Sequence, residues 1–111
     1  GLADLPLFRP APPTDGTVHA RHLYPVLVDA SLCGVTRDDL QLRMREAGVD
    51  TSIHFRAVHL HSYYRDRFGF QRGMFPHAEA VSDSTLSLPL SPAMPDSDVD
   101  RVIEALHECL R

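Results

Sequence analysis

The sequence predicts a two-layer α+β domain in which about three strands carry helices packed on one face. Segments with strand patterns alternate with helical segments in the order strand, helix, strand, short helices, strand, helix. The last segment, 99–110, places apolar residues at i, i+3, i+4, i+7 and i+11, the stripe of a helix that packs on another layer. With 111 residues, the chain is long enough for one modest core.

Residues 1–18 are predicted to be an extended, proline-rich linker that ends in a turn. They hold Pro6, Pro10, Pro12 and Pro13, followed by Thr14, Asp15 and Gly16. Domain boundaries fall in segments of this composition, and a chain that crosses from a preceding domain often begins this way. We therefore expect the linker to come from a missing large domain and the folded domain to span residues 19–111.

A strand and a helix are expected next. Residues 22–29 are rich in β-branched and aromatic side chains, and Pro25 among them indicates an edge position or a bulge. Thr36 can cap a helix that runs through Ala47 and stops at Gly48. Its buried stripe would be Leu40, Met44 and Ala47. Its solvated face would carry Arg37, Arg43, Arg45 and Glu46.

The remaining elements are shorter, except for the last helix. Residues 49–55 are predicted as a second strand, and residues 85–90, where leucine alternates with other residues, as a third. Short helices are expected at 59–65 and at 76–82, because Pro76 suits the first turn of a helix. Three strands leave an edge and a second sheet face to cover, which indicates a missing neighbour.

Composition limits the possible partners. The formal charge of −4 gives no basic footprint, so we expect no nucleic acid partner. No apolar run approaches ~18 residues, so we expect no segment that spans a membrane. Cys33 and Cys109 stand far apart without metal-ligand spacing, which predicts free thiols and a cytoplasmic location.

The densest polar cluster is formed by His54, Arg56, His59 and His61. Metal binding is disfavoured, because His59 and His61 would point to different faces of a helix and no cysteine or carboxylate joins them. An arginine and imidazoles at a strand end can instead hydrogen-bond phosphate or sugar hydroxyls. The cluster could instead be a histidine capped by backbone beside a surface arginine, and composition alone favours this structural interpretation.

No catalytic constellation is predicted within the chain. The serines at 82, 84 and 87 lack the glycines of a nucleophile elbow, and the scattered glycines form no phosphate-binding loop. The acidic residues at the start of the last helix lack the glycine and terminal glutamate of a calcium loop, so they are assigned to the helix dipole. These residues are Asp96, Asp98 and Asp100.

Several segments carry a family resemblance when they are taken together. In chain order they are GVDTSIHF at 48–55, His59, FPHAE at 75–79, LSLPL at 86–90 and DVDRVI at 98–103. This order resembles the C-terminal small domain of the DegT/DnrJ/EryC1/StrS family of sugar aminotransferases, and the likeness covers nearly everything from His22 to Leu106.

One branch of that family is especially similar. HFRA at 54–57, His59 and YYRDRF at 63–68 resemble the UDP-4-amino-4-deoxy-L-arabinose–oxoglutarate aminotransferases, which serve lipid A modification. Many members of the family carry a tyrosine where Phe55 stands, so a hydroxyl that contacts the sugar would be absent here.

The resemblance implies a homodimeric, fold-type-I enzyme that uses pyridoxal 5'-phosphate (PLP). A large N-terminal domain would carry the Schiff-base lysine and the PLP site. Glutamate would donate the amino group and become 2-oxoglutarate, and a 4-keto UDP-sugar would accept it for lipid A or another cell-surface polysaccharide. Within this chain the resemblance implies no catalytic, cofactor-binding or metal residue, but one wall of the sugar-nucleotide site. That wall would consist of His54, Phe55, Arg56 and His59.

The chain contains no lysine, because all eleven basic side chains are arginines. A PLP Schiff base forms on a lysine amine, so the chain by itself is expected to bind no PLP and to catalyse nothing. An arginine-favouring genome would also explain this composition. The chain is therefore either a piece of an enzyme or a non-catalytic, stand-alone module for binding or dimerisation. The proline-rich opening and the uncovered sheet face favour the first. An independent small α+β enzyme would need a catalytic pair within the chain, and none is found.

Overall fold

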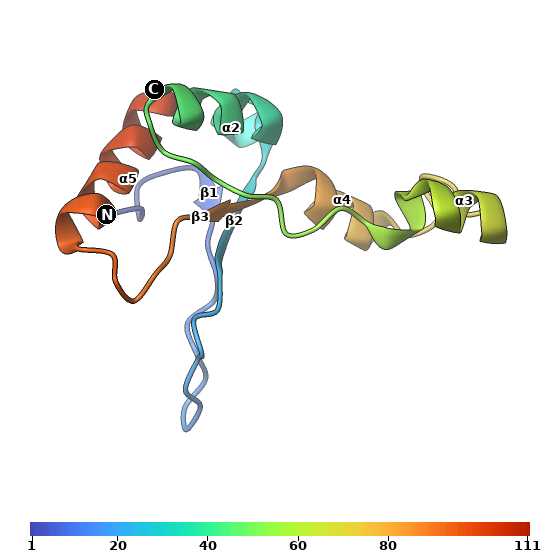
Figure 1. Cartoon of the computed structure of the whole chain (residues 1–111), viewed down its shortest axis with the longest axis horizontal. Coiled ribbons are helices and arrows are strands. Elements are labelled where there is room, and N and C mark those ends of the chain that lie inside the picture. The colour runs from blue at the N-terminus through green and yellow to red at the C-terminus, as the bar shows by residue number, and fades with distance from the viewer.

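The computed structural model describes all 111 residues and shows an antiparallel sheet of three short strands, with two long helices packed on it (Figure 1). The strand order is β1 (Leu7–Phe8), β2 (Tyr24–Val28) and β3 (Thr85–Leu88). The helices are α1 (Ala30–Cys33), α2 (Arg37–Glu46), the 3-10 turn η1 (Val58–Leu60), α3 (Ser62–Phe68), α4 (Pro76–Ser84) and α5 (Asp96–Cys109). The predicted α+β class with three strands is confirmed. No helix is both long and apolar enough to cross a membrane.

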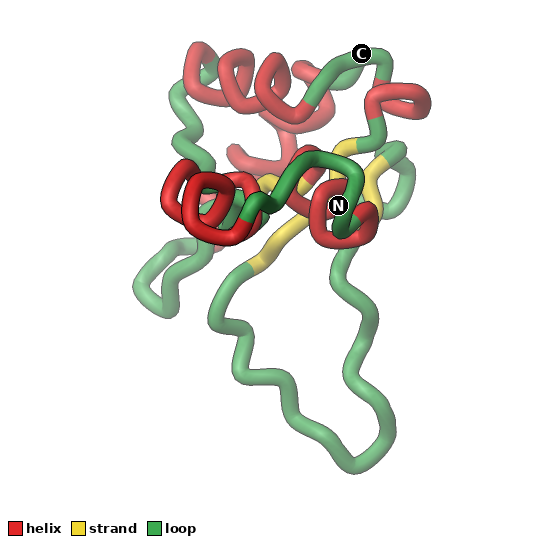
Figure 2. The backbone as a smooth tube through the Cα atoms, turned by 90° about the vertical axis from the view of Figure 1, so that its right-hand side faces the viewer, coloured by secondary structure: helices red, strands yellow, loops and turns green.

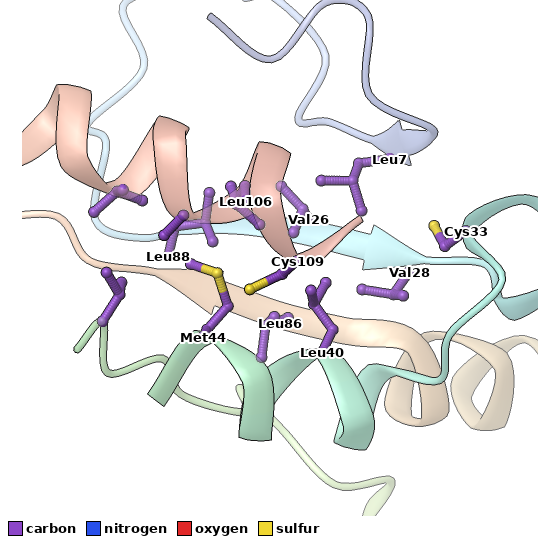
Figure 3. Packing of buried hydrophobic residues seen from close by; sticks show 13 residues of the cluster. Leu7, Val26, Val28, Cys33, Leu40, Met44, Leu86, Leu88, Leu106 and Cys109 are labelled. Carbon is purple, nitrogen blue, oxygen red and sulfur yellow. The ribbon is translucent and has the colours of Figure 1, made fainter. Parts of the chain in front are cut away.

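The hydrophobic core lies between the sheet and the pair α2 and α5, which lie together on the same side of the sheet in Figure 1. Side chains alternate across a strand, so Val26 of β2 and Leu86 of β3, which are paired in register, face the helices together. Figure 3 shows Leu40 of α2 and Leu106 of α5 reaching into the same cluster. The apolar stripes of the two helices and the apolar face of the sheet therefore pack together as one core.

Helix α2 begins and ends as its sequence predicts. The Thr36 hydroxyl accepts a hydrogen bond from the Asp39 amide at 3.1 Å and so caps the first turn. At the other end Gly48 has φ 79°, and the amides of Gly48 and Val49 donate to the carbonyls of Arg45 and Met44. This pair of hydrogen bonds is a Schellman motif, which requires the left-handed backbone that glycine adopts without strain.

Strand β2 is the central strand, although Pro25 indicated an edge or a bulge. Pro25 stands opposite Ser87 of β3, and both backbone groups of Ser87 are hydrogen-bonded to Ser52 on its other side. The Pro25 nitrogen therefore faces the β1 side, where the pairing ends at Leu27 opposite Phe8. A missing N–H costs no ladder bond at that point, which explains why a central strand tolerates this proline.

The first eight residues pack against the domain, whereas the sequence placed them in an extended linker. Leu7 belongs to the core cluster and pairs with Val28, and the Cys33 thiol donates to the Pro6 carbonyl oxygen at 3.0 Å. Residues 9–23 then run out from the sheet and return as a long, exposed loop (Figures 1 and 2). The predicted turn lies at its tip, where the Thr17 amide donates to the Thr14 carbonyl.

The strand predicted at 49–55 is reduced to a single bridge between Ser52 and Ser87. The next outward-facing carbonyl of β3, that of Thr85, accepts a hydrogen bond from the Arg37 guanidinium at 3.0 Å instead of from a strand. An arginine of α2 thus ends the ladder, and the chain turns away after Ser52. The sheet still has three strands, because β1 takes the place of the strand predicted at 49–55.

Residues 58–84 form an arm that extends to one side of the sheet (Figure 1). The short helix predicted at 59–65 is divided into η1 and α3, and the one predicted at 76–82 is α4. No residue of α3 is buried. With this arm and the 9–23 loop, the radius of gyration is 15.8 Å, whereas a compact chain of this length would have about 13 Å.

Candidate functional site

A cleft of about 620 Å³ separates the arm from the start of α2. Its walls are the 53–61 segment, the N-terminal end of α2, the C-terminal half of α4 and the loop before α4. Three guanidinium and two carboxylate groups line it, those of Arg37, Arg56, Arg72, Asp38 and Asp83. The excess of cations gives the cleft a chemistry that favours an anionic ligand.

Arg37 lines the cleft. Its position in the helix pattern predicted a solvated face, but the side chain is largely covered by the rest of the fold. Its side chain is only 12% exposed, and its guanidinium donates to Asp38 and to the carbonyls of Ser82 and Thr85. These carbonyls lie at the C-terminal end of α4, where the helix dipole favours a positive charge. Arg37 therefore anchors α2 to α4.

Arg72, on the loop before α4, pairs with Asp83 on α4. Its guanidinium donates two hydrogen bonds to the Asp83 carboxylate, at 2.7 and 3.2 Å. This bidentate pair raises the pKa of Arg72 and holds the pKa of Asp83 below its usual range, and the nearby Arg37 and Arg56 charges lower the Asp83 pKa further. Arg72 is thus occupied by a carboxylate of the chain.

Arg56 makes no hydrogen bond or ion pair with any side chain or backbone group of the chain. The neighbouring Phe55 also lines the cleft, and it is 73% exposed. The structure therefore brings two of the predicted site residues together at the cleft wall, as a free guanidinium beside an accessible aromatic ring.

His54 does not line the cleft and is hydrogen-bonded instead to strand β3. Its Nδ1 is 2.9 Å from the Ser87 hydroxyl, and its ring meets that of Phe55 edge to face with centroids 4.9 Å apart. The hydroxyl fixes the orientation of the imidazole and leaves Nε2 as the ring nitrogen without a partner in the chain.

His59 is buried, with 6% of its surface exposed. Its Nε2 is 2.8 Å from Oε1 of Glu79, which also accepts hydrogen bonds from the amides of Gly73 and Phe75. The Gly73 amide is the largest influence that holds the pKa of Glu79 below its usual range, and the His59 hydrogen bond acts in the same direction. His59 is therefore directed into the arm, away from the cleft.

Sequence reasoning missed Arg37, Arg72, Glu79 and Asp83. Glu79 was part of the FPHAE run, but nothing in that run shows that its carboxylate turns inward. Arg72 and Asp83 lie eleven residues apart in segments of different structure, so no helical or strand spacing connects them.

Outside the cleft, the chain has one apolar pocket and two buried thiols. A more apolar pocket of about 370 Å³ lies beside α5 and is lined by residues such as Leu2, Tyr24, Met94 and Ile103. Cys33 and Cys109 are buried free thiols, and burial raises the pKa of both. No group of three or more histidine, cysteine, aspartate or glutamate side chains is placed to hold a metal ion.

Comparison with known proteins gives a consistent result. The sequence model of the DegT/DnrJ/EryC1/StrS aminotransferase family matches residues 1–107. The chain is 32% identical to DesV of S. venezuelae, which was solved with a ketimine intermediate. The match covers 99% of this chain and 28% of DesV, with a TM-score of 0.83. It is 34% identical to the aminotransferase TlmJ of Streptoalloteichus hindustanus, over 95% of this chain and 26% of that one, with a TM-score of 0.78.

A third likeness, at 24% identity, shows the fold alone. It is to Spr1654 of Streptococcus pneumoniae, assigned as a sugar aminotransferase and solved in a PLP form, with a TM-score of 0.81 over 99% of this chain and 29% of that one. In all three cases the chain spans a little over a quarter of the length of the protein that it matches.

Proposed function

Because the chain belongs to the DegT/DnrJ/EryC1/StrS aminotransferase family, we propose that it is the C-terminal small domain of a PLP-dependent sugar aminotransferase. The reaction would move an amino group from glutamate to a 4-keto UDP-sugar. A large domain, joined through the segment before β1, would supply the rest of the enzyme, which would act as a homodimer. The length of the relatives supports this, since about three quarters of each lies outside the match.

The residues of this chain do not fit PLP by themselves. PLP supplies an electron sink when it is bound to a lysine amine, and the chain has no lysine. The basic side chains of the cleft are three arginines and His61, and none of them is a primary amine that could form a Schiff base. The role proposed for this domain is therefore to bind and orient the sugar nucleotide.

The observation that carries this proposal is the free Arg56 guanidinium beside the exposed Phe55 ring. A guanidinium without a partner can donate charge-assisted hydrogen bonds to a phosphate, and an aromatic face can pack against a sugar or a base. His54 does not line the cleft itself, but because Ser87 holds its Nδ1, its Nε2 would be free to contact a sugar that extends past Phe55. His59, which is buried, would support the wall from behind.

We further propose a UDP-4-keto pentose as the acceptor, for lipid A or another cell-surface polysaccharide. The support is the HFRA segment at 54–57 together with YYRDRF at 63–68. Phe55 lacks a hydroxyl, so the sugar would be contacted at that position by an apolar ring. A series of UDP- and dTDP-linked 4-keto sugars, compared by kcat/KM with glutamate as donor, would test this choice.

The proposed site is tested by Arg56→Gln in the full-length polypeptide, with Arg45→Gln as the matched control. Arg45 is exposed on α2 and lies outside the cleft. Loss of one charge-assisted hydrogen bond corresponds to about a tenfold to hundredfold rise in KM for the sugar nucleotide. The half-reaction with glutamate should be unchanged, and His54→Ala should behave similarly. Equal losses in both half-reactions would contradict a sugar-side role.

A simpler measurement separates this proposal from the stand-alone module. The intact mass of the polypeptide made from its native locus should be several times that of the 12.4 kDa chain. A mass equal to that of the 111 residues would support a non-catalytic module for binding or dimerisation.

A further inference from the structure

Three segments that line the cleft meet on its buried side at one carboxylate. Glu79 lies in the first turn of α4 and is almost inaccessible. Its two oxygens lie 2.8 and 2.9 Å from the Gly73 amide, and Oε1 is also 3.3 Å from the Phe75 amide and 2.8 Å from Nε2 of His59. We call these four residues the Glu79 hub.

Three members of the hub lie on segments that line the cleft. His59 lies on the segment that carries Phe55 and Arg56, and Gly73 follows Arg72 directly. Glu79 itself is one helical turn before Asp83 on α4. A shift of either loop away from Glu79 would therefore move one wall of the cleft relative to the other.

The hydrophobic core does not hold these segments. Every member of the core cluster lies at or before Val49, or at or after Leu86, and so do the partly buried apolar residues packed against it. Within the arm, the hub joins η1 and the loop before α4 to α4. Just before the arm, the Ala57 amide donates to the Ser82 hydroxyl of α4. Aromatic rings also touch, such as those of His59 and Phe75 with centroids 4.8 Å apart. Because little apolar burial acts here, buried polar contacts determine where the arm lies.

We propose that Glu79 is a positioning residue for the cleft, which fixes the placement of Arg56 on one wall relative to Arg72 on the other. The part of this proposal that concerns a ligand rests on the proposed function, since the ligand would be the sugar nucleotide. The part that concerns geometry rests on the chain alone. Glu79 touches no ligand in this account and acts through the two loops that it holds.

The first measurement is hydrogen exchange in the full-length polypeptide, followed by mass spectrometry. The variants are Glu79→Gln and Glu79→Ala, and the control is Glu104→Gln, because Glu104 is exposed on α5 and makes no hydrogen bond through its side chain. A lost hydrogen bond to a charged group corresponds to about tenfold or more in opening, so peptides covering 70–78 should exchange at least about tenfold faster. Peptides covering β2, in the core, should be unchanged. Unchanged exchange at 70–78 in both variants would overturn the proposal.

The second measurement distinguishes positioning from a merely structural role. Glu79→Gln should raise KM for the sugar nucleotide about tenfold while the rate of the glutamate half-reaction stays constant. Glu79→Asp, which keeps a carboxylate, should restore part of the loss. Faster exchange without a change in KM would overturn the positioning role. If the wild-type enzyme used no sugar nucleotide, the proposed function and the ligand part would both fail, and the exchange result would still decide the geometric part.

Discussion

Replacing Ser82 with alanine removes one oxygen atom at the joint between the cleft wall and α4. The Ser82 side chain is 5% exposed, and its hydroxyl accepts a hydrogen bond from the Ala57 amide at 2.8 Å. Ala57 is itself buried, so its amide depends on this acceptor. The Ser82→Ala variant would therefore leave a buried amide without a partner and disturb nothing else of comparable size.

The expected magnitude follows from two opposing effects. An unsatisfied buried amide costs about 1–3 kcal/mol. Alanine is a better helix former than serine, which returns roughly 0.5 kcal/mol in α4. The net loss in the free energy of unfolding should therefore be about 0.5–2.5 kcal/mol.

Ser84→Ala provides a matched control in the same helix. The Ser84 hydroxyl donates to the carbonyl of Ala80, at 2.7 Å within the same helix, and satisfies no distant group. Its replacement should leave stability unchanged or raise it slightly. Both variants can be measured by urea unfolding with circular dichroism, since the chain has no tryptophan. Equal free energies of unfolding for the two variants would refute the reasoning that the Ala57 amide depends on Ser82.

Three other predictions follow from the core, a helix end and the hub. Leu106→Ala, at a fully buried position of α5, should lower the free energy of unfolding by about 2–5 kcal/mol, and a loss below about 1 kcal/mol in urea would mean that the site is less tightly packed. Gly48→Ala should lower the free energy of unfolding by about 1–2 kcal/mol, seen as a lower Tm, because a non-glycine residue is strained at φ 79°. The added methyl group would also meet the end of the Arg101 side chain, which is flexible and can move away. The pKa of Glu79 is lowered in the folded state, chiefly by the Gly73 amide, so its carboxylate stabilises the fold above the ordinary glutamate pKa. That stability is lost as the pH falls through the lowered pKa, so unfolding curves of wild type and Glu79→Gln should converge in acid, and a constant difference across pH would contradict this.

Local patterns were sufficient for the elements whose stability is local. The capping threonine, the apolar spacing and the stop at Gly48 predicted α2 to within one residue at each end, because a helix forms hydrogen bonds only among neighbours in the sequence. The α5 stripe likewise identified the helix that covers the sheet. The strand at 85–90 was recognised by alternation, although β3 is shorter than predicted.

Strand pairing and the cleft depended on distant partners. β1 has two residues, too few for any alternation to be visible, and it exists because Leu7 finds Val28 and the core. The predicted strand at 49–55 is reduced to one bridge, and Arg37 takes the Thr85 carbonyl where the ladder would continue. No property of the 49–55 segment itself could have shown this.

The four predicted site residues were separated only by folding. In the sequence they lie within six residues of one another. In the structure Phe55 and Arg56 reach the cleft, His54 is hydrogen-bonded to β3 and His59 turns inward to Glu79. The two histidines are directed by partners 33 and 20 residues away, Ser87 for His54 and Glu79 for His59.

The sequence by itself determined the α+β class, the two long elements of the helical layer, the absence of a lysine and the family to which the chain is similar. These properties depend on composition and on the spacing of residues along the chain, and both can be read without knowing which distant segments meet. Only the tertiary structure decided that Arg37 is largely covered and hydrogen-bonded to α4, that Arg56 is left without a partner and that Glu79 joins the cleft walls. The physical reason is that a charge is free or satisfied according to what the rest of the fold brings within hydrogen-bonding distance.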